Sequence, residues 1–211
     1  MALLYQATLR PTKLELLSDW LPGRPWYTGS AGETLQIASF RFDDPAGAVG
    51  METILVRVGD GPVHQMPLTY REAPLPGGDA WLLGTSEHSV LGMRWVYDAV
   101  GDPVYAAALA GAIIGGTGQA EKLVQVDGRL VRREPDMSVV GGGGGGEAVV
   151  MPAVGEIERV TEDDPTVIVT DTIELAVVRR LDVGVELADV VLRGSWPGQE
   201  TPVPLASARL R

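Results

Sequence analysis

The chain has two histidines, His64 and His88, and no cysteine, so few of its side chains could perform acid–base or nucleophilic chemistry. His88 has the richer surroundings, because Glu87, Ser86 and Ser89 adjoin it. A serine, a histidine and a carboxylate could form a hydrolytic triad, yet the sequence lacks the G-x-S-x-G turn that presents such a serine. Two histidines from separate segments also fall short of a zinc ligand set. We therefore predict structural hydrogen bonding for His88 and no metal site, with an enzyme of unrelated chemistry around Glu87 and His88 as the alternative.

Two aromatic groups could bind a sugar by stacking. Trp26 and Tyr27 follow the first predicted helix, and Arg94, Trp95 and Tyr97 lie on a predicted strand. Alternation along a strand places Trp95 and Tyr97 on one face and Arg94 on the other. Large aromatic side chains are more often part of a core or an interface than of a ligand site. We favour packing for both groups and keep a sugar or sugar-phosphate site as an alternative.

Six consecutive glycines at 141–146 suggest a phosphate-binding loop at first sight. Such a loop needs backbone donors that lead into a helix N-terminus, with a cation close by. Here the run is followed by Glu147 and by the strand-like sequence AVVMP, which brings negative charge to the place of the phosphate. We predict a flexible connection between strands and no cofactor.

Length and charge narrow the function classes further. A chain of 211 residues can bury a sizeable core as one large or two small domains. The net charge of −11 argues against a nucleic-acid partner, because phosphate binding requires clustered Lys and Arg. No apolar stretch reaches the roughly 20 residues that span a bilayer, so no membrane association is expected. The absence of cysteine is compatible with the cytoplasm, which is the location we predict.

The first half of the chain reads as one helix followed by a meander of strands. Thr12 and Glu15 have the spacing of a capping box, which opens a helix that Pro22 and Gly23 end. Pro67 cannot donate to a strand ladder, so its strand is predicted at an edge or a bulge, where self-association is possible. Period-two patterns predict strands at 33–42, 51–58, 63–70, 81–85 and 93–97.

The second half opens with another helix. Asp102 is a predicted N-cap and Pro103 the first residue of a helix that runs to Ile114. A hairpin follows, because Asp127 and Gly128 separate two apolar runs. Further strands are predicted at 138–140, 148–151, 156–160, 166–170 and 173–180, and the proline-containing tail is predicted to be extended. The fold class is α+β: a helix on a curved antiparallel sheet at residues 1–98, followed by a second antiparallel-sheet subdomain at 99–211.

Residues 66–105 carry a family resemblance. The sequences PLTYREAPL, GTSEHSVLG and RWVYDAVGDPVY are similar to the N-terminal cap and adjoining region of the actinobacterial maltokinases and glucosamine kinases. Those enzymes phosphorylate a sugar with ATP, using a eukaryotic-kinase-like lobe that follows this region. The resemblance implies a cap-like subdomain and, after it, a subdomain similar to a kinase N-terminal lobe.

The resemblance also predicts which chemistry the chain lacks. In the related kinases a strand of the form L-K-V-F-R-R-L holds the nucleotide phosphates through its lysine, and this position is Ala176 in the sequence ELAVVRRLDVG. The loop that precedes this strand contains Asp163 and Asp164, which would repel a triphosphate. No catalytic lobe follows within the 211 residues, so we expect no kinase activity from this sequence alone.

The resulting hypothesis is a non-catalytic, maltokinase-cap-like protein. We expect it to act as a regulatory or protein-interaction module linked to maltose, trehalose, glycogen or aminosugar metabolism, with a protein partner or with a second copy bound through a sheet edge. Candidate ligand or interface residues are Trp26, Tyr27, His88, Arg94, Trp95 and Tyr97.

Overall fold

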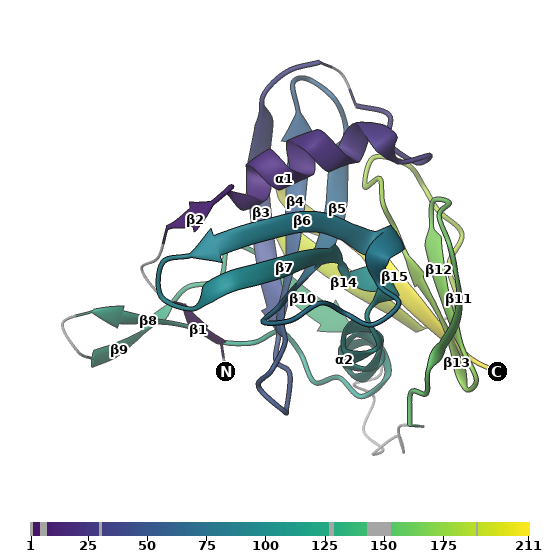
Figure 1. The fold of residues 1–211 in the computed structure, drawn as a ribbon. Helices are drawn as coiled ribbons and strands as arrows, with labels where there is room; N and C mark the ends of the chain where they lie inside the picture. The colour runs from purple at the N-terminus through teal and green to yellow at the C-terminus, as the bar shows by residue number, and fades with distance from the viewer. Residues whose placement is uncertain (1, 5–7, 30, 127–128, 143–152, 189) are drawn as a thin grey trace.

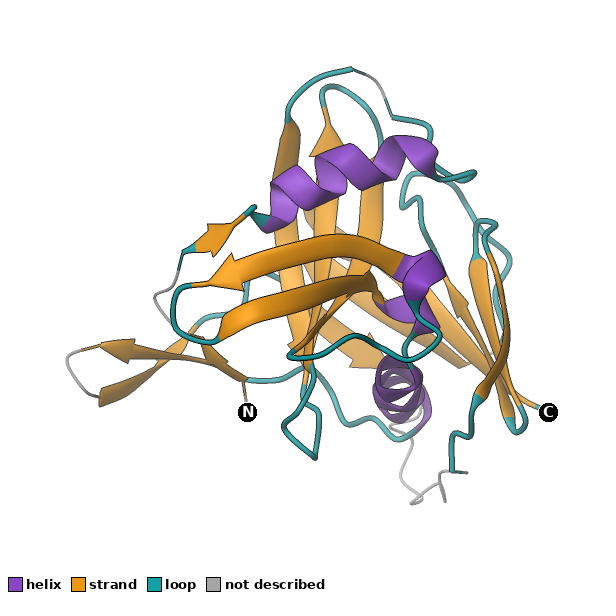
Figure 2. Ribbon diagram, in the orientation of Figure 1, coloured by secondary structure: helices purple, strands orange, loops and turns teal. Residues whose placement is uncertain are grey.

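The protein is described from a computed structural model, which covers residues 2–4, 8–29, 31–126, 129–142, 153–188 and 190–211. Within these ranges the chain forms two α-helices, three short 3-10 helices and three β-sheets (Figures 1 and 2). The α+β prediction is confirmed in part, because helices do pack on curved antiparallel sheets, but the fold is mostly β. The 3-10 helices are η1 (Leu21–Gly23), η2 (Asp79–Trp81) and η3 (Ala99–Gly101).

The first sheet has six antiparallel strands from the first half of the chain. Their spatial order is β2 (Leu9–Arg10), β6 (Leu82–His88), β7 (Gly92–Asp98), β5 (Val63–Arg71), β4 (Gly50–Val58) and β3 (Thr34–Phe42). These bounds confirm the strands predicted at 33–42, 51–58, 63–70 and 93–97 and extend the one predicted at 81–85.

Helix α1 (Lys13–Trp20) lies across one face of this sheet (Figure 1). The predicted capping box is present: the Glu15 N–H donates to Thr12 Oγ1 at 3.2 Å, and the Thr12 N–H donates to the Glu15 carboxylate at 2.6 Å. Leu17 of the helix is fully buried in one cluster with Ile54 and Met66 of the sheet. The cap fixes where the helix begins, and the leucines fix which face it turns to the sheet.

The second sheet also has six antiparallel strands, ordered β10 (Ser138–Gly141), β14 (Val190–Trp196), β15 (Gln199–Leu210), β13 (Ile173–Val177), β12 (Thr166–Thr170) and β11 (Ile157–Thr161). The extended tail is thus strand β15, which forms a hairpin with β14. Helix α2 (Pro103–Ile114) begins at the predicted N-cap, where the Asp102 side chain accepts a hydrogen bond from the Val104 N–H at 3.0 Å.

A small third sheet joins the N-terminal strand to a hairpin of the second half. Strand β1 (Ala2–Leu4) pairs in parallel with β8 (Lys122–Val126), which pairs with β9 (Arg129–Arg133). The predicted hairpin strands are confirmed, while the Asp127–Gly128 turn lies outside the described residues. The strand predicted at 148–151 and most of the glycine run, from 143 onward, lie outside them as well.

One hydrophobic core is formed by residues from both halves of the chain. It contains Phe40 and Leu55 from the first sheet, Leu109 and Ile113 from α2, and Leu175 from the second sheet. The middle strands of the first sheet, β4 and β5, are therefore buried on both faces, by α1 on one side and by the second half of the chain on the other. The division into 1–98 and 99–211 stays a prediction, and its boundary falls within a continuous core.

The prediction that Pro67 marks a sheet edge or a bulge is wrong. Its strand, β5, is an interior strand between β4 and β7, and it pairs with β4 through Pro67 without a register shift. The pairing with β7 begins at Leu68, whereas at the other end of β5 the Gln65 N–H donates to the Arg179 carbonyl. Pro67 lies between the segment that contacts Arg179 and the segment that pairs with β7, so no neighbouring strand needs a hydrogen bond from an N–H at this position. A central strand can thus accommodate a proline where it changes neighbours.

Candidate functional site

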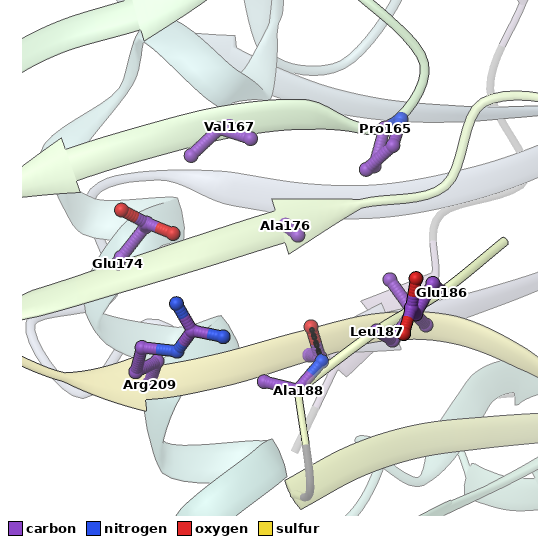
Figure 3. Close-up of a pocket in the computed structure, with 9 residues that line it drawn as sticks. Pro165, Val167, Glu174, Ala176, Glu186, Leu187, Ala188 and Arg209 are labelled. Carbon is purple, nitrogen blue, oxygen red and sulfur yellow. Dashed lines mark hydrogen bonds between the residues drawn. The ribbon is translucent and has the colours of Figure 1, made fainter.

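A cavity of about 380 Å³ lies on the outer face of the second sheet (Figure 3). The register of three neighbouring strands builds its floor: Val167 of β12 pairs with Ala176 of β13, and Ala176 pairs with Ser207 of β15. Strand β13 alternates between buried and partly exposed residues, so its even-numbered side chains face this cavity and its odd-numbered ones the core. The volume is within the range of small-molecule sites.

Charged side chains border this floor. Glu174 and Arg209 are register partners on β13 and β15 and project on the same side of the sheet (Figure 3). Glu186 and Ala188 come from the connection between β13 and β14, and the Ala188 N–H donates to Ser207 Oγ at 3.4 Å. The site combines a small apolar floor with carboxylates and one guanidinium. It can bind a polar group, but no cation stands at the centre of its floor.

Trp26 and Tyr27 lie elsewhere, at the contact between the two halves of the chain. Trp26 is buried, and its ring centroid is 6.0 Å from that of His64, which is also 5.1 Å from that of Tyr27. The Arg179 Cζ atom lies 4.8 Å from the Trp26 centroid. The Arg24 guanidinium extends the junction, with Cζ at 4.3 Å from the Trp20 centroid. Two cation–π contacts therefore accompany the aromatic packing.

Arg179 and Asp98 form a fully buried ion pair beside these rings. The Arg179 Nη2 donates to Asp98 Oδ2 at 2.7 Å, and its Nε donates to Thr166 Oγ1 at 2.8 Å. Burial raises the pKa of Asp98, while the Arg179 charge opposes that rise. Asp98 ends the first sheet, whereas Arg179 and Thr166 belong to the second half, so the pair joins the two. Asp164 supports Arg179 by accepting hydrogen bonds from the backbone N–H groups of Arg179 and Arg180.

His64 is fully buried at the same junction, and neither ring nitrogen has a well-formed hydrogen bond to a described residue. Burial lowers the pKa of His64, and the charge of Arg180 lowers it further. The histidine therefore contributes as a neutral ring packed against Tyr27.

The other predicted site residues do not meet Trp26 and Tyr27 in one site. His88 Nδ1 accepts hydrogen bonds from the Val90 and Leu91 N–H groups at 3.2 and 3.1 Å, which shapes the turn between β6 and β7. Arg94 donates from Nη2 to the Leu91 carbonyl of the same turn at 2.7 Å. The geometry thus places these two side chains in local backbone contacts, away from the Figure 3 cavity.

The pair on β7 also differs from a sugar-stacking platform. Tyr97 is buried, and its hydroxyl accepts a hydrogen bond from the Leu75 N–H at 2.9 Å. Trp95 is only partly buried.

Among the described residues no three His, Asp or Glu side chains come together as a metal-binding group.

Sequence reasoning did not single out His64, Asp98 or Arg179 as site residues. A signal was present for two of them, since Asp98 stands within WVYDAV and Arg179 follows LAVV. A charge within an apolar run predicts a buried ion pair, because an isolated buried charge is too costly. The partner could not be identified, because the two residues are 81 positions apart.

Comparison with known protein families gives a match in the first half of the chain. Residues 20–102 match the family model of the maltokinase N-terminal cap domain. The matched range contains strands β3 to β7, and among them are β4 and β5, whose residues are buried on both faces of the sheet. No curated protein matches the chain. None of the helices in the described ranges is both long and apolar enough to span a membrane.

Proposed function

We propose that this chain is a maltokinase-related module that acts by binding a partner protein and does not itself transfer phosphate. The observation that carries the proposal is the match of residues 20–102 to the maltokinase cap domain. The proposal extends the resemblance to the second half and names the partner as an enzyme of maltose, trehalose, glycogen or aminosugar metabolism. A cytoplasmic location is part of it.

The chemistry of the cavity in Figure 3 supports the non-catalytic part. In the resemblance to the maltokinases described above, Ala176 at the centre of this floor stands where the related kinases have the lysine that holds the nucleotide phosphates. Glu174 and Glu186 border the same floor and would repel a triphosphate. In the preceding loop, both carboxylate oxygens of Asp164 accept hydrogen bonds from the backbone N–H groups of Arg179 and Arg180. These bonds hold the Asp164 side chain against the protein backbone.

Two measurements test the absence of phosphate transfer. Purified protein is incubated with ATP, magnesium and maltose, trehalose or glucosamine, and sugar phosphate is quantified; we expect none above a no-enzyme control. The unfolding temperature is measured with the same compounds. A ligand at 100 times its dissociation constant stabilises by about 2.7 kcal/mol, which a thermal scan detects. Sugar phosphate formation, or a shift with ATP and magnesium, would overturn this part of the proposal.

A binding experiment tests the partner. The full chain is titrated against a purified maltokinase from which the cap has been deleted, with the intact maltokinase as the matched control. We expect the cap-deleted enzyme to bind more tightly, because the intact enzyme already carries a cap of its own. Equal or absent binding to both forms would contradict the proposed partner class.

A further inference from the structure

Strand β9 is an open edge of the small third sheet. Among the described strands it pairs only with β8, which leaves the backbone groups on its other side without a strand partner. All five of its residues are exposed, including two large apolar side chains, Leu130 at 55% and Val131 at 47%. The β8–β9 hairpin also extends away from both six-stranded sheets (Figure 1). An exposed edge with apolar side chains can accept another strand.

The edge of the first sheet at β3 is different. The Ala120 N–H donates to the Arg41 carbonyl of β3 at 2.8 Å, and Lys122 Nζ donates to the Ser39 carbonyl at 3.3 Å. The chain itself therefore covers part of that edge, at Ser39 and Arg41, just before it enters the β8–β9 hairpin. No described strand covers β9 in this way. Strand β11 is also an exposed edge, but it carries one arginine where β9 carries three.

Charge indicates the kind of strand that fits. Strand β9 reads RLVRR, so it carries three arginines in five residues of a chain whose net charge is −11. Arg129, Val131 and Arg133 share one face because side chains alternate along a strand. Arg132, on the other face, pairs with Glu121 at 3.1 Å. A strand added beside β9 with the pattern acidic–apolar–acidic at alternate positions would form opposite-charge pairs across the ladder.

A second copy of this chain does not fit the same edge. Antiparallel pairing of two β9 strands about Val131 would place Arg129 opposite Arg133 at both ends, and like charges directly opposite destabilise a sheet.

We propose that β9 is a docking edge for an extended acidic segment of a partner protein, which adds as a further strand of the third sheet. This rests on the proposed function, since it names the surface and the chemistry through which the partner binds. Main-chain hydrogen bonds supply the affinity in such strand addition, and the arginines select the acidic sequence.

A peptide titration tests the edge directly. The probe is a seven-residue peptide with blocked ends in which glutamate, valine and glutamate occupy alternate positions between threonines; the control peptide has lysine in place of glutamate. We follow both by NMR chemical shifts of the full chain. We expect binding of the acidic peptide only, with shifts centred on 129–133 and an affinity that falls with added salt. Equal binding of both peptides, or shifts centred elsewhere, would overturn the proposal.

Substitutions make the test specific. Arg129→Glu combined with Arg133→Glu should reverse the preference toward the lysine peptide, with about a tenfold loss for the acidic one. Arg159→Glu, on the exposed edge strand β11, is the matched control and should change nothing. Leu130→Pro and Val131→Pro are both made, because successive N–H groups alternate sides and one of the two removes a donor from the open edge. Unchanged binding in both proline variants would show that β9 accepts no strand.

The same variants are then titrated with the cap-deleted maltokinase. If the unmodified chain binds it and the charge-reversed chain binds equally well, the β9 proposal fails while the proposed function stands. If the unmodified chain does not bind it but does bind the acidic peptide through β9, the edge proposal stands and the partner class fails.

Discussion

The two six-stranded sheets differ in how many of their faces are covered. In the first sheet, β4 is buried without interruption from Met51 to Val56, because α1 covers one face and the second half of the chain covers the other. In the second sheet, β13 alternates between buried and partly exposed residues, and its outer face carries the Figure 3 cavity. The middle of the first sheet is thus covered on both faces, whereas the described residues leave one face of the second sheet partly exposed.

This difference bears on what the family match means. The matched residues 20–102 contain β4 and β5, the strands of the first sheet that are buried on both faces. The open cavity and the open β9 edge lie outside the matched range. The family match therefore covers the strands that are buried on both faces, and it includes neither the Figure 3 cavity nor the β9 edge.

The largest expected effect concerns the ion pair that joins the two halves. Arg179→Met leaves Asp98 as an unpaired buried carboxylate, so the free energy of unfolding should fall by about 3–5 kcal/mol, measured by urea denaturation. Arg180→Met is the control, because its pair with Asp182 is partly exposed and worth about 1 kcal/mol or less. Replacing both members, with Arg179→Met and Asp98→Leu, should recover much of the loss. Equal losses at Arg179 and Arg180 would contradict a joint at this pair.

The second prediction compares core packing in the two sheets. Ile54→Ala removes a fully buried side chain beneath α1 and should cost about 2–5 kcal/mol. Val167→Ala, on the open face of the second sheet, should cost less than about 1 kcal/mol. Both are measured by urea denaturation at neutral pH. Similar costs would mean that the outer face of the second sheet is covered in solution, for example by another chain.

The sequence predicts the local features of this fold well and the long-range ones poorly. The capping box at Thr12, the N-cap at Asp102 and the period-two strands depend on neighbouring residues, and the structure confirms them. The position of Pro67 in an interior strand was not predictable, because it depends on which distant segments flank β5. The junction of His64 and Arg179 with the predicted Trp26 and Tyr27 is long-range in the same sense.

The third prediction concerns Glu52, a buried carboxylate of the first sheet. Burial raises its pKa, but Arg41 and Lys13 outweigh that effect and bring it to about 2 from 4.5. Because the folded-state pKa is depressed, the stabilisation is present above about pH 4.5 and is lost as the pH falls toward 2. The shift corresponds to about 3 kcal/mol, which Glu52→Gln should remove at neutral pH. The control is Glu158→Gln. Glu158 lies on β11 and forms an exposed ion pair with Arg211, so its loss should change the free energy of unfolding by about 1 kcal/mol or less.

The smallest expected effect on stability is that of His64, which lies where the first sheet contacts the second half of the chain. Its folded-state pKa is lower than 6.5, because the ring is buried and Arg180 is close, although Asp182 and Asp164 act in the opposite direction. The unfolded chain therefore binds more protons just below pH 6.5, so stability is fully present above that pH and declines as the pH falls toward the folded-state pKa.

His64→Phe keeps an aromatic ring against Tyr27 but cannot be protonated, so the decline between pH 7.5 and 5.5 should be smaller than in the unmodified protein. The free energy of unfolding is measured by urea denaturation at both pH values. His88→Phe is the comparison. Burial lowers the pKa of His88 as well, but His88 lies in a more exposed turn at the far end of β6, so its loss should remove the smaller share of the pH dependence. If His64→Phe retains the full decline and His88→Phe abolishes it, protonation of His88 in the turn causes the loss of stability. The junction at His64 would then not contribute to the pH dependence in this range.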